Sequence, residues 1–483
     1  MVQFGMDGTT GFALSPGERF EKYTAGLMRA VGHADRGEPL RLYCAGLLMP
    51  GERKSVEPMA ARLVPDDVRS THQRMHHLVA DSPWSDRRVL TAVRDYALPV
   101  FEAHGGVLAW IVDDTGIPKK GKHSVGVARQ YCGVLGKQDN CQVAVSLSVA
   151  NERLSLPVAY ELYLPETWAG NKELRRKAGI PDEIVFRTKL EIALVQMRTA
   201  VEEGVPRGVV LSDAGYGNST AFRDGVTAMG LTYMVGIQAA TTVWPRGEGP
   251  LPAPAFTGKG RPPRLLTRDE DHQPVSAEDL ARTVGRARFR SVTWRQGTRT
   301  PLTSRFCALR VRPAHRDYWR TEARAEEWLL IEWPSGLKEP TKYFLSTLPA
   351  DTPLPTLVRI AKLRWRIERD YEELKDELGL DHYEGRGWRG FHHHSTLCIA
   401  AYGFLAVERG LFSPSGVSLL GLPFQIAPVP EGFRPRGAPD PGAAPRSRVH
   451  RDDANTDRPP ARRVDPAMSL LPQTGHQRAS RSH

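Results

Sequence analysis

Cysteine is scarce in this chain of 483 residues, and signals for secretion or membrane insertion are missing. The five cysteines are scattered and include no Cys-x2-Cys pair. This pattern excludes a disulfide framework and a zinc ribbon, and it favours a reducing cytosol. The first residues, MVQFGMDGTTGF, lack a basic segment and an apolar core, so they predict no signal peptide. No apolar run approaches the roughly 18 residues of a membrane span. We expect a soluble intracellular protein without a membrane partner.

Acidic residues are outnumbered by basic ones. Lysine and arginine total 66 against 55 aspartates and glutamates, which gives a net charge of +11. Such a balance favours a polyanionic partner, with nucleic acid first and an acidic membrane surface second. The length allows two or three domains.

The pattern of apolar residues changes along the chain and predicts five segments. The first has apolar residues at helical spacing, and a small basic helical bundle would suit DNA. The second and fourth alternate strand-like and helical stretches, which predicts a mixed α/β sheet with helices packed on it. The third is rich in proline, glycine, arginine and aromatic residues. The expected divisions are a helical DNA-binding domain at 1–100, the first part of the core at 101–240, a β-rich insertion at 241–340, the last part of the core at 341–410 and a disordered basic tail at 411–483.

The last segment has an unusual composition. Residues 429–483 contain no lysine and few large apolar residues, so they cannot bury enough surface to order themselves. Two interpretations stay open. One is a disordered basic tail, and the other is a sequence altered by a frameshift relative to a functional ancestor.

Three carboxylates stand at informative positions. Asp114 follows an apolar strand at residues 107–112, Asp213 follows a second strand at residues 208–211, and Glu368 lies on a late helix. A two-metal site for phosphoryl transfer needs hard oxygen ligands arranged in this way, because they hold Mg²⁺ while water and phosphate complete its coordination. One acidic residue after a strand is weak evidence. Three acidic residues in this order, with a basic insertion before the third, are stronger evidence for a two-metal site.

The helix that carries Glu368 has the sequence RWRIERDYEELK at residues 364–375. Helical spacing places Arg364, Glu368, Glu372 and Lys375 on one face. Leu363, Ile367, Leu374 and Leu378 are placed to bury another face. A simpler interpretation is a charged surface helix held by pairs such as Arg364–Glu368.

Three stretches carry a resemblance to a known family: IVDDTGIPKKGKHSVGVARQYCG, VVLSDAGYGNSTAFRDG and LRWRIERDYEELKDELGLDHYEGRGWRGFHHH. Over residues 15–410 the chain resembles bacterial insertion-sequence transposases of the DDE class, whose catalytic core has an RNase H-like fold. It is most similar to the branch with a Tyr-x2-Arg-x3-Glu-x6-Lys helix signature and a β-rich insertion before the glutamate. Within that branch it resembles the insertion-sequence family numbered seven hundred and one.

The resemblance implies roles for individual residues. Asp114, Asp213 and Glu368 would be the catalytic, metal-binding triad. Asp114 is preferred to Asp113 because the family's aspartate is typically followed by threonine, here Thr115; adjacent strand residues face opposite ways, so only one should face the metals. The tyrosine of the signature is replaced by Ala361, which puts one phosphate contact in doubt. Arg364 and Lys375 would bind DNA phosphates, with Lys119, Lys120 and Lys122 as weaker candidates, and one of Trp294, Trp319 and Trp328 would stack a flipped base.

Two histidine groups invite a metal interpretation. His72, His76 and His77 lack a suitable fourth ligand nearby, so we expect a basic helical surface there. Consecutive histidines at positions 392–394 point in different directions on a helix and cannot all bind one ion. We predict a DNA-facing or solvated run there.

The sequence therefore predicts a DNA transposase of the cut-and-paste type, an Mg²⁺-dependent DNA endonuclease and strand transferase in the bacterial cytoplasm, with Mn²⁺ as a substitute ion. Its partners would be the terminal inverted repeats of its own element and target DNA, and it would act as a dimer assembled on DNA. Two alternatives stay open: an RNase H-like nuclease without strand transfer, and a catalytically inactive transposase remnant that binds DNA.

Overall fold

The computed structural model describes residues 14–412 except residues 259, 298 and 299. The predicted tail falls almost entirely outside the described residues. The chain begins with helices whose starts follow from local capping. At the first of them the Ser15 side chain accepts from the Glu18 N–H and the Glu18 carboxylate accepts from the Ser15 N–H, a reciprocal cap that satisfies two otherwise unpaired donors. The helices are α1 (Pro16–Val31), α2 (Gly37–Leu48), α3 (Val56–Leu63), α4 (Val68–Ala80) and α5 (Asp86–Ala103).

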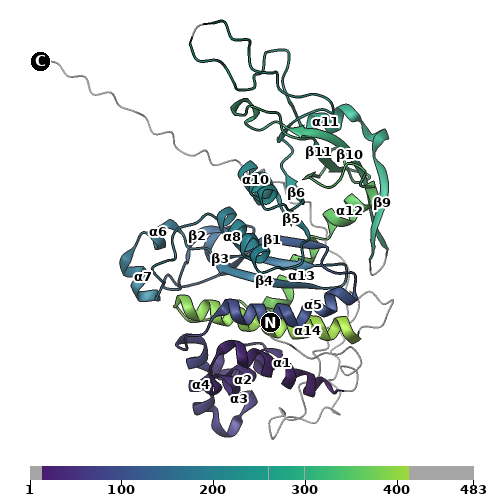
Figure 1. Ribbon diagram of the computed structural model, residues 1–483. Coiled ribbons are helices and arrows are strands. Elements are labelled where there is room, and N and C mark those ends of the chain that lie inside the picture. Colours follow the sequence, from purple (N-terminus) through teal and green to yellow (C-terminus); the bar gives the residue numbers. More distant parts are fainter. Residues whose placement is uncertain (1–13, 259, 298–299, 413–483) are drawn as a thin grey trace, which may run out of the picture. The chain divides into compact units, whose positions relative to one another are not determined.

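A mixed sheet follows, flanked by helices as predicted (Figure 1). Its central strands carry runs of consecutive buried residues, as expected where helices cover both faces, and helices lie between those that run parallel. Its strands are β1 (Ala109–Pro118), β2 (Ala128–Cys132), β3 (Lys137–Ala150), β4 (Ser155–Leu162), β5 (Val209–Ser212) and β6 (Tyr233–Ile237). The helices among them are α6 (Glu166–Ala169), α7 (Lys172–Ala178), α8 (Lys189–Glu202), α9 (Ala214–Gly217) and α10 (Thr220–Ala228).

Strand β1 continues through the aspartates, which the sequence had placed at its end. It pairs antiparallel with β3 along its whole length, from Ala109 opposite Ala150 to Pro118 opposite Cys141. On its other edge it pairs parallel with β5 only as far as Ile111 opposite Leu211. The two aspartates therefore lie on a part of β1 that is paired on one side only, beyond the end of β5.

The predicted β-rich insertion is present, and its strands extend the core sheet. Its elements are β7 (Thr242–Trp244), β8 (Val275–Ser276), α11 (Ala277–Val284), β9 (Arg290–Gln296), β10 (Pro301–Pro313) and β11 (Glu327–Glu332). Strand β12 (Lys342–Ser346) then pairs antiparallel with both β6 and β11, so it joins the two regions. The sheet order is β2-β3-β1-β5-β6-β12-β11-β10-β7-β8, with β4 on β3 and β9 on β10.

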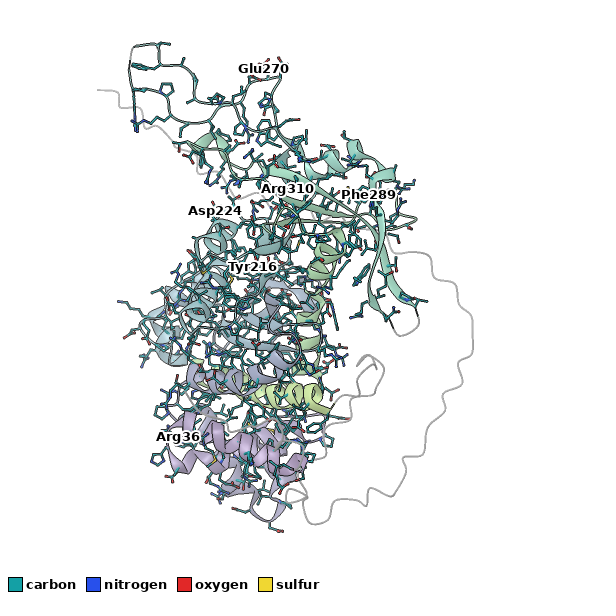
Figure 2. The ribbon with its side chains drawn as sticks, turned by 45° about the vertical axis from the view of Figure 1, so that its right-hand side comes forward. Arg36, Tyr216, Asp224, Glu270, Phe289 and Arg310 are labelled. Atoms are coloured by element: carbon teal, nitrogen blue, oxygen red, sulfur yellow. The ribbon has the colours of Figure 1, made fainter. Side chains whose placement is uncertain are left out.

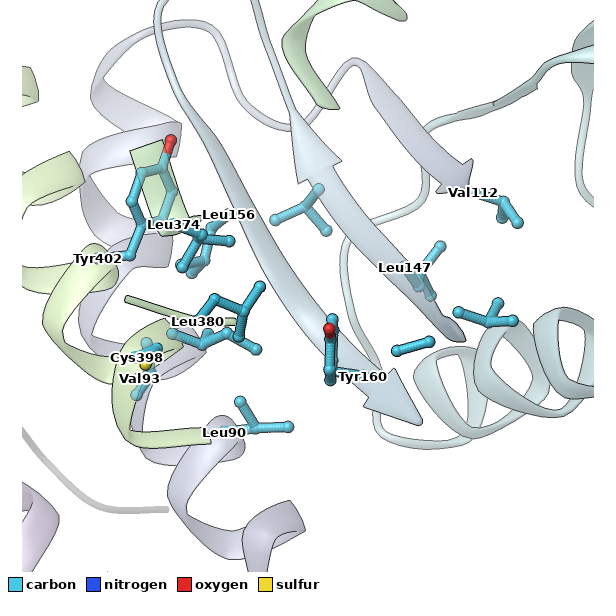
Figure 3. Packing of buried hydrophobic residues seen from close by; sticks show 14 of the residues in the cluster. Leu90, Val93, Val112, Leu147, Leu156, Tyr160, Leu374, Leu380, Cys398 and Tyr402 are labelled. Carbon is cyan, nitrogen blue, oxygen red and sulfur yellow. The ribbon is translucent and has the colours of Figure 1, made fainter. Parts of the chain in front are cut away.

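The chain returns to the core in three α-helices and one π-helical turn. Helix α12 (Leu354–Lys362) is followed by α13 (Trp365–Glu372), a π-helical turn (Glu373–Glu377) and α14 (Trp388–Phe412). As predicted, Leu363, Ile367, Leu374 and Leu378 are buried. Figure 3 shows Leu374 and Leu380 with Leu156 of β4 and Tyr402 of α14, within the main apolar cluster.

Helix α14 is a core element. It packs against α2, α5 and β4, and nearly all of its residues are buried. By length and composition it could cross a membrane, but most of it lies inside the protein, as expected for the core helix of a globular fold. Among the described residues it is the one helix that meets this test.

The histidine run in α14 is buried, so the predicted DNA-facing or solvated run is wrong. The imidazole of His394 contacts the Tyr43 hydroxyl at 2.8 Å and the Gly379 carbonyl at 2.9 Å, and His393 stacks on Trp84 with ring centroids 3.6 Å apart. Burial lowers the pKa of each of the three histidines to about 4. They point to different partners, which agrees with the argument against a shared ion.

A buried ion pair ties the first helix to the last. The Arg19 guanidinium donates to both carboxylate oxygens of Glu408, at 2.7 and 2.6 Å, and the two side chains are 5% and 9% exposed. Removing one partner leaves the other charge buried without compensation, which costs about 3–5 kcal/mol.

We therefore expect Glu408→Ala to lower the free energy of unfolding by about 3–5 kcal/mol, measured by chemical denaturation. The control is Glu173→Ala, which removes an exposed pair with Lys177 and should change stability by less than about 1 kcal/mol. Equal effects of the two substitutions would show that the buried pair does not hold the helices together.

Candidate active site

Two aspartates meet where the parallel strands end. The register of β1 with β5 pairs Ala109 with Val209 and Ile111 with Leu211, so Asp213, just past β5, comes level with Asp113. The Asp213 side chain caps α9, because its Oδ1 accepts the N–H groups of Gly215 at 2.9 Å and Tyr216 at 3.3 Å. Figure 2 labels Tyr216, which lies in the first turn after this cap.

Helix α13 brings the third carboxylate to β1 through one arginine. The Arg364 guanidinium donates through Nη1 to Asp113 Oδ2 at 2.9 Å and through Nη2 to Glu368 Oε1 at 2.6 Å. The pair of Arg364 with Glu368, which the simpler interpretation of a charged surface helix included, is present. Glu368 itself is 64% exposed. The site therefore combines two carboxylates held by one cation and a third on the neighbouring strand end.

Asp113, and not Asp114, faces Glu368. Asp113 lies opposite Ser146 of β3, and the Tyr371 hydroxyl of α13 contacts Ser146 Oγ at 2.7 Å and the Asp113 carbonyl at 3.3 Å. Side chains of neighbouring strand residues point to opposite faces. The preference for Asp114 from the sequence stays a prediction, but the structure pairs Asp113, not Asp114, with the arginine that also holds Glu368. The local pattern of two aspartates before a threonine does not reveal which face of the strand α13 will cover.

Asp114 has partners of its own on the other face. Its Oδ2 accepts from Lys189 Nζ of α8 at 3.1 Å and from the Tyr216 hydroxyl at 3.3 Å. The contact with Tyr216 joins β1 to α9, the helix that follows Asp213. Sequence reasoning missed Lys189, Tyr216 and Tyr371. Tyr371 alone gave a signal, since it lies one turn after Glu368.

The electrostatics of the site reflect its burial. Burial raises the pKa of Asp113 to about 7, although the Arg364 guanidinium opposes the shift, and the nearby Asp213 carboxylate raises it further. A like charge nearby disfavours the ionised form of a carboxyl group, and a positive charge favours it. Arg364 supplies that positive charge to Asp113.

The predicted lysines lie toward the far end of β1. Lys375 donates to the Gly116 carbonyl at 3.0 Å and Lys119 to the Tyr383 carbonyl at 2.8 Å, and burial lowers the pKa of both amines. Lys120 and Lys122 are exposed. Lys119 and Lys120 line a surface cleft of about 740 Å³ that also holds acidic side chains, such as Glu384.

Ala361, at the tyrosine position of the helix signature, is 5% exposed in α12. It packs in an apolar cluster with Leu357 and Val358. The position serves packing here, so this chain has no side chain at 361 that could reach a phosphate.

The three candidate tryptophans differ in exposure. Trp319 is 59% exposed beside Arg316, whose guanidinium lies 4.7 Å from its ring centroid. Its turn is anchored by the buried Asp317, which accepts from Trp244 Nε1 at 2.7 Å. Trp294 and Trp328 are half-buried, under Lys362 and Arg310 respectively. Trp319 is thus the most accessible of the three.

The residues present supply the donor chemistry of a divalent-ion site but not its arrangement. Asp113, Asp213 and Glu368 offer the hard oxygen ligands that Mg²⁺ prefers. Among the described residues, however, no three histidine, cysteine or acidic side chains gather closely enough to hold an ion. Arg364 lies between two of the carboxylates. An ion would require this guanidinium to move.

Comparison with known proteins gives two matches. The sequence profile of the family described as DDE superfamily endonuclease matches residues 26–301, more than half of the chain, and ends before Glu368. The chain is also 32% identical over 203 residues to a probable transposase for insertion sequence element IS701 from Microchaete diplosiphon. That similarity covers 42% of this chain and 49% of the relative, so the chain spans about half the length of the curated relative it matches.

The profile match covers β1 with Asp113 and Asp114, and β5 with Asp213. The mixed sheet flanked by helices agrees with the RNase H-like fold that the sequence predicted. The chain belongs to the DDE superfamily of endonucleases.

Proposed function

We propose that this protein is a DNA transposase that cleaves the ends of its own insertion sequence and joins them to target DNA. The observation that supports it best is the link that Arg364 makes between Asp113 on β1 and Glu368 on α13, beside a strand register that brings Asp213 level with Asp113. The similarity to a probable insertion-sequence transposase favours the same class of reaction.

The proposed reaction has two steps of phosphoryl transfer. Water attacks the phosphodiester at the element's end, which leaves a 3′-hydroxyl and a 5′-phosphate. The 3′-hydroxyl then attacks a phosphodiester of target DNA, forms a new ester and releases the target's 3′-oxygen. A bound Mg²⁺, or Mn²⁺ in its place, would supply Lewis-acid stabilisation of charge on the phosphate oxygens. The protein's own contribution is to position the carboxylates and the DNA.

The charge of the chain supports DNA as the partner. A net charge of +11 favours binding that depends on phosphates and weakens with salt. Arg364 and Lys375 are the proposed phosphate contacts nearest the carboxylates, with Lys119, Lys120 and Lys122 just after the end of β1. We further propose the helical segment at residues 1–100 as a DNA-binding domain, a dimer assembled on the two element ends, and action in the cytoplasm.

Cleavage of DNA that flanks the gene tests the proposal. In Mg²⁺, we expect wild type to cut at the element's end, and Asp113→Asn and Glu368→Gln each to lower the rate at least about 10²–10³-fold while DNA binding survives. Asp114→Asn should retain most activity, because its side chain faces Lys189.

Two results would change this assignment. Loss of cleavage in Asp114→Asn with activity retained in Asp113→Asn would restore the sequence-based choice of triad. Binding without cleavage in the wild type would favour an inactive remnant. A pre-cleaved end in a strand-transfer assay separates a transposase from a nuclease without joining activity.

Trp319 gives a prediction about DNA contact. Stacking of a base on an exposed aromatic ring contributes about 1–3 kcal/mol. Trp319→Ala should therefore weaken binding of DNA with an unpaired base about 5- to 150-fold, measured by fluorescence anisotropy. Tyr131→Ala is the matched control, because Tyr131 is 60% exposed on β2, outside the insertion. Equal losses in both variants would argue against a specific role for Trp319.

A further inference from the structure

We propose that Arg364 is an internal counter-cation that keeps Asp113 and Glu368 closed to divalent ions until a DNA phosphate takes its guanidinium. The inference rests on the proposed function, since it assumes that these carboxylates hold a metal during the reaction. It adds a coupling between DNA binding and metal binding, set by one side chain.

The geometry carries the first step of the argument. The two Nη atoms of Arg364 engage carboxylates from two elements, Asp113 on β1 at 2.9 Å and Glu368 on α13 at 2.6 Å. A guanidinium presents donors in a fixed fork, so one cation can bridge two carboxylates. A divalent ion on the same oxygens would lie next to this positive charge. The guanidinium and the ion therefore compete for one pair of ligands.

The side chain is placed so that it can change partners. Arg364 is 25% exposed and Glu368 is 64% exposed, and pairs with this much access to water are weak. Phosphate oxygens accept the arginine fork in the same two-pronged manner as carboxylates. A phosphodiester at the site could thus replace Glu368 at little cost. Asp113, whose side chain is 17% exposed, is the less accessible partner, and the phosphate must take its place as well.

The backbone at this point also departs from regular helix. Arg364 lies between the end of α12 at Lys362 and the start of α13 at Trp365. Around it the N–H of Arg366 donates to the Leu363 carbonyl at 3.1 Å and that of Ile367 to the Arg364 carbonyl at 3.1 Å, both three residues back. A short tightened turn inside a longer helix often marks a hinge. This junction gives Arg364 a place from which to move without unwinding α13.

The functional consequence is order of assembly. If Arg364 and the metal compete, then DNA that binds Arg364 raises the affinity for metal, and metal raises the affinity for DNA by the same factor. The free protein would then hold its metal weakly, and full assembly of the site would require bound DNA. Such a protein would hold a complete metal site only while DNA occupies it.

Direct measurement of Mn²⁺ binding without DNA tests this coupling. Free Mn²⁺ is followed by electron paramagnetic resonance during titration of the full chain. We expect Arg364→Gln to bind Mn²⁺ about tenfold more tightly than wild type, in the range of ordinary coupled sites. Arg359→Gln is the control of equal charge on α12, since Arg359 pairs with Glu152 and should leave the affinity unchanged. Adding Glu368→Gln to Arg364→Gln should abolish the gain.

A second titration adds a 30-base-pair duplex of random sequence, with the signal of duplex alone subtracted. The duplex should tighten Mn²⁺ binding by wild type and have little effect on Arg364→Gln. Wild type and Arg364→Gln could instead bind Mn²⁺ with equal affinity, and Glu368→Gln could abolish that binding. This result would contradict the proposed role of Arg364 but would support the proposed metal site. Absence of specific Mn²⁺ binding in every variant, with and without duplex, would overturn both. Circular dichroism of each variant shows whether it is folded.

Discussion

The unequal pairing of β1 is the constraint on which the site depends. On one edge β3 holds β1 along its full length, and on the other β5 leaves it after three residues. The first pairing fixes the alternation of side chains, so it decides that Asp113 faces α13. The second leaves open backbone beside the aspartates, and Asp213 enters there from the next strand. The open edge at the candidate site thus results from the shorter neighbouring strand β5.

The two adjacent aspartates of β1 lie on opposite faces of the strand and have different partners. Asp113 faces the helix of Glu368, while Asp114 is held by Lys189 and Tyr216 on the opposite side. Because Tyr216 lies in the turn that Asp213 caps, the hydrogen bond from Tyr216 to Asp114 connects the end of β5 with β1. On one face of β1, Asp113 is linked through Arg364 to Glu368. On the other face, Asp114 links β1 to the turn that follows β5.

Several features of the candidate site could be predicted from the sequence, and the reason differs from one element to the next. Helical spacing alone predicted the buried face of α13 and the pair between Arg364 and Glu368, because both are local properties of one helix. The choice between Asp113 and Asp114 depends on which helix covers which face of the sheet, a long-range fact that alternation cannot supply. The burial of the histidines at 392–394 was missed for the same reason: their partners, such as Val79 and Tyr43, lie far away in the sequence.

The position of α14 in the core has a consequence for synthesis of the protein on the ribosome. This helix is the last described element, yet it fills the space between α2, α5 and β4 near the start of the chain. The early helices cannot complete their packing until residues 388–412 leave the exit tunnel, since contacts between distant segments form late. A nascent chain stopped before that point would expose apolar surface and be a substrate for proteases. The described fold can thus be completed only after translation has passed residue 412.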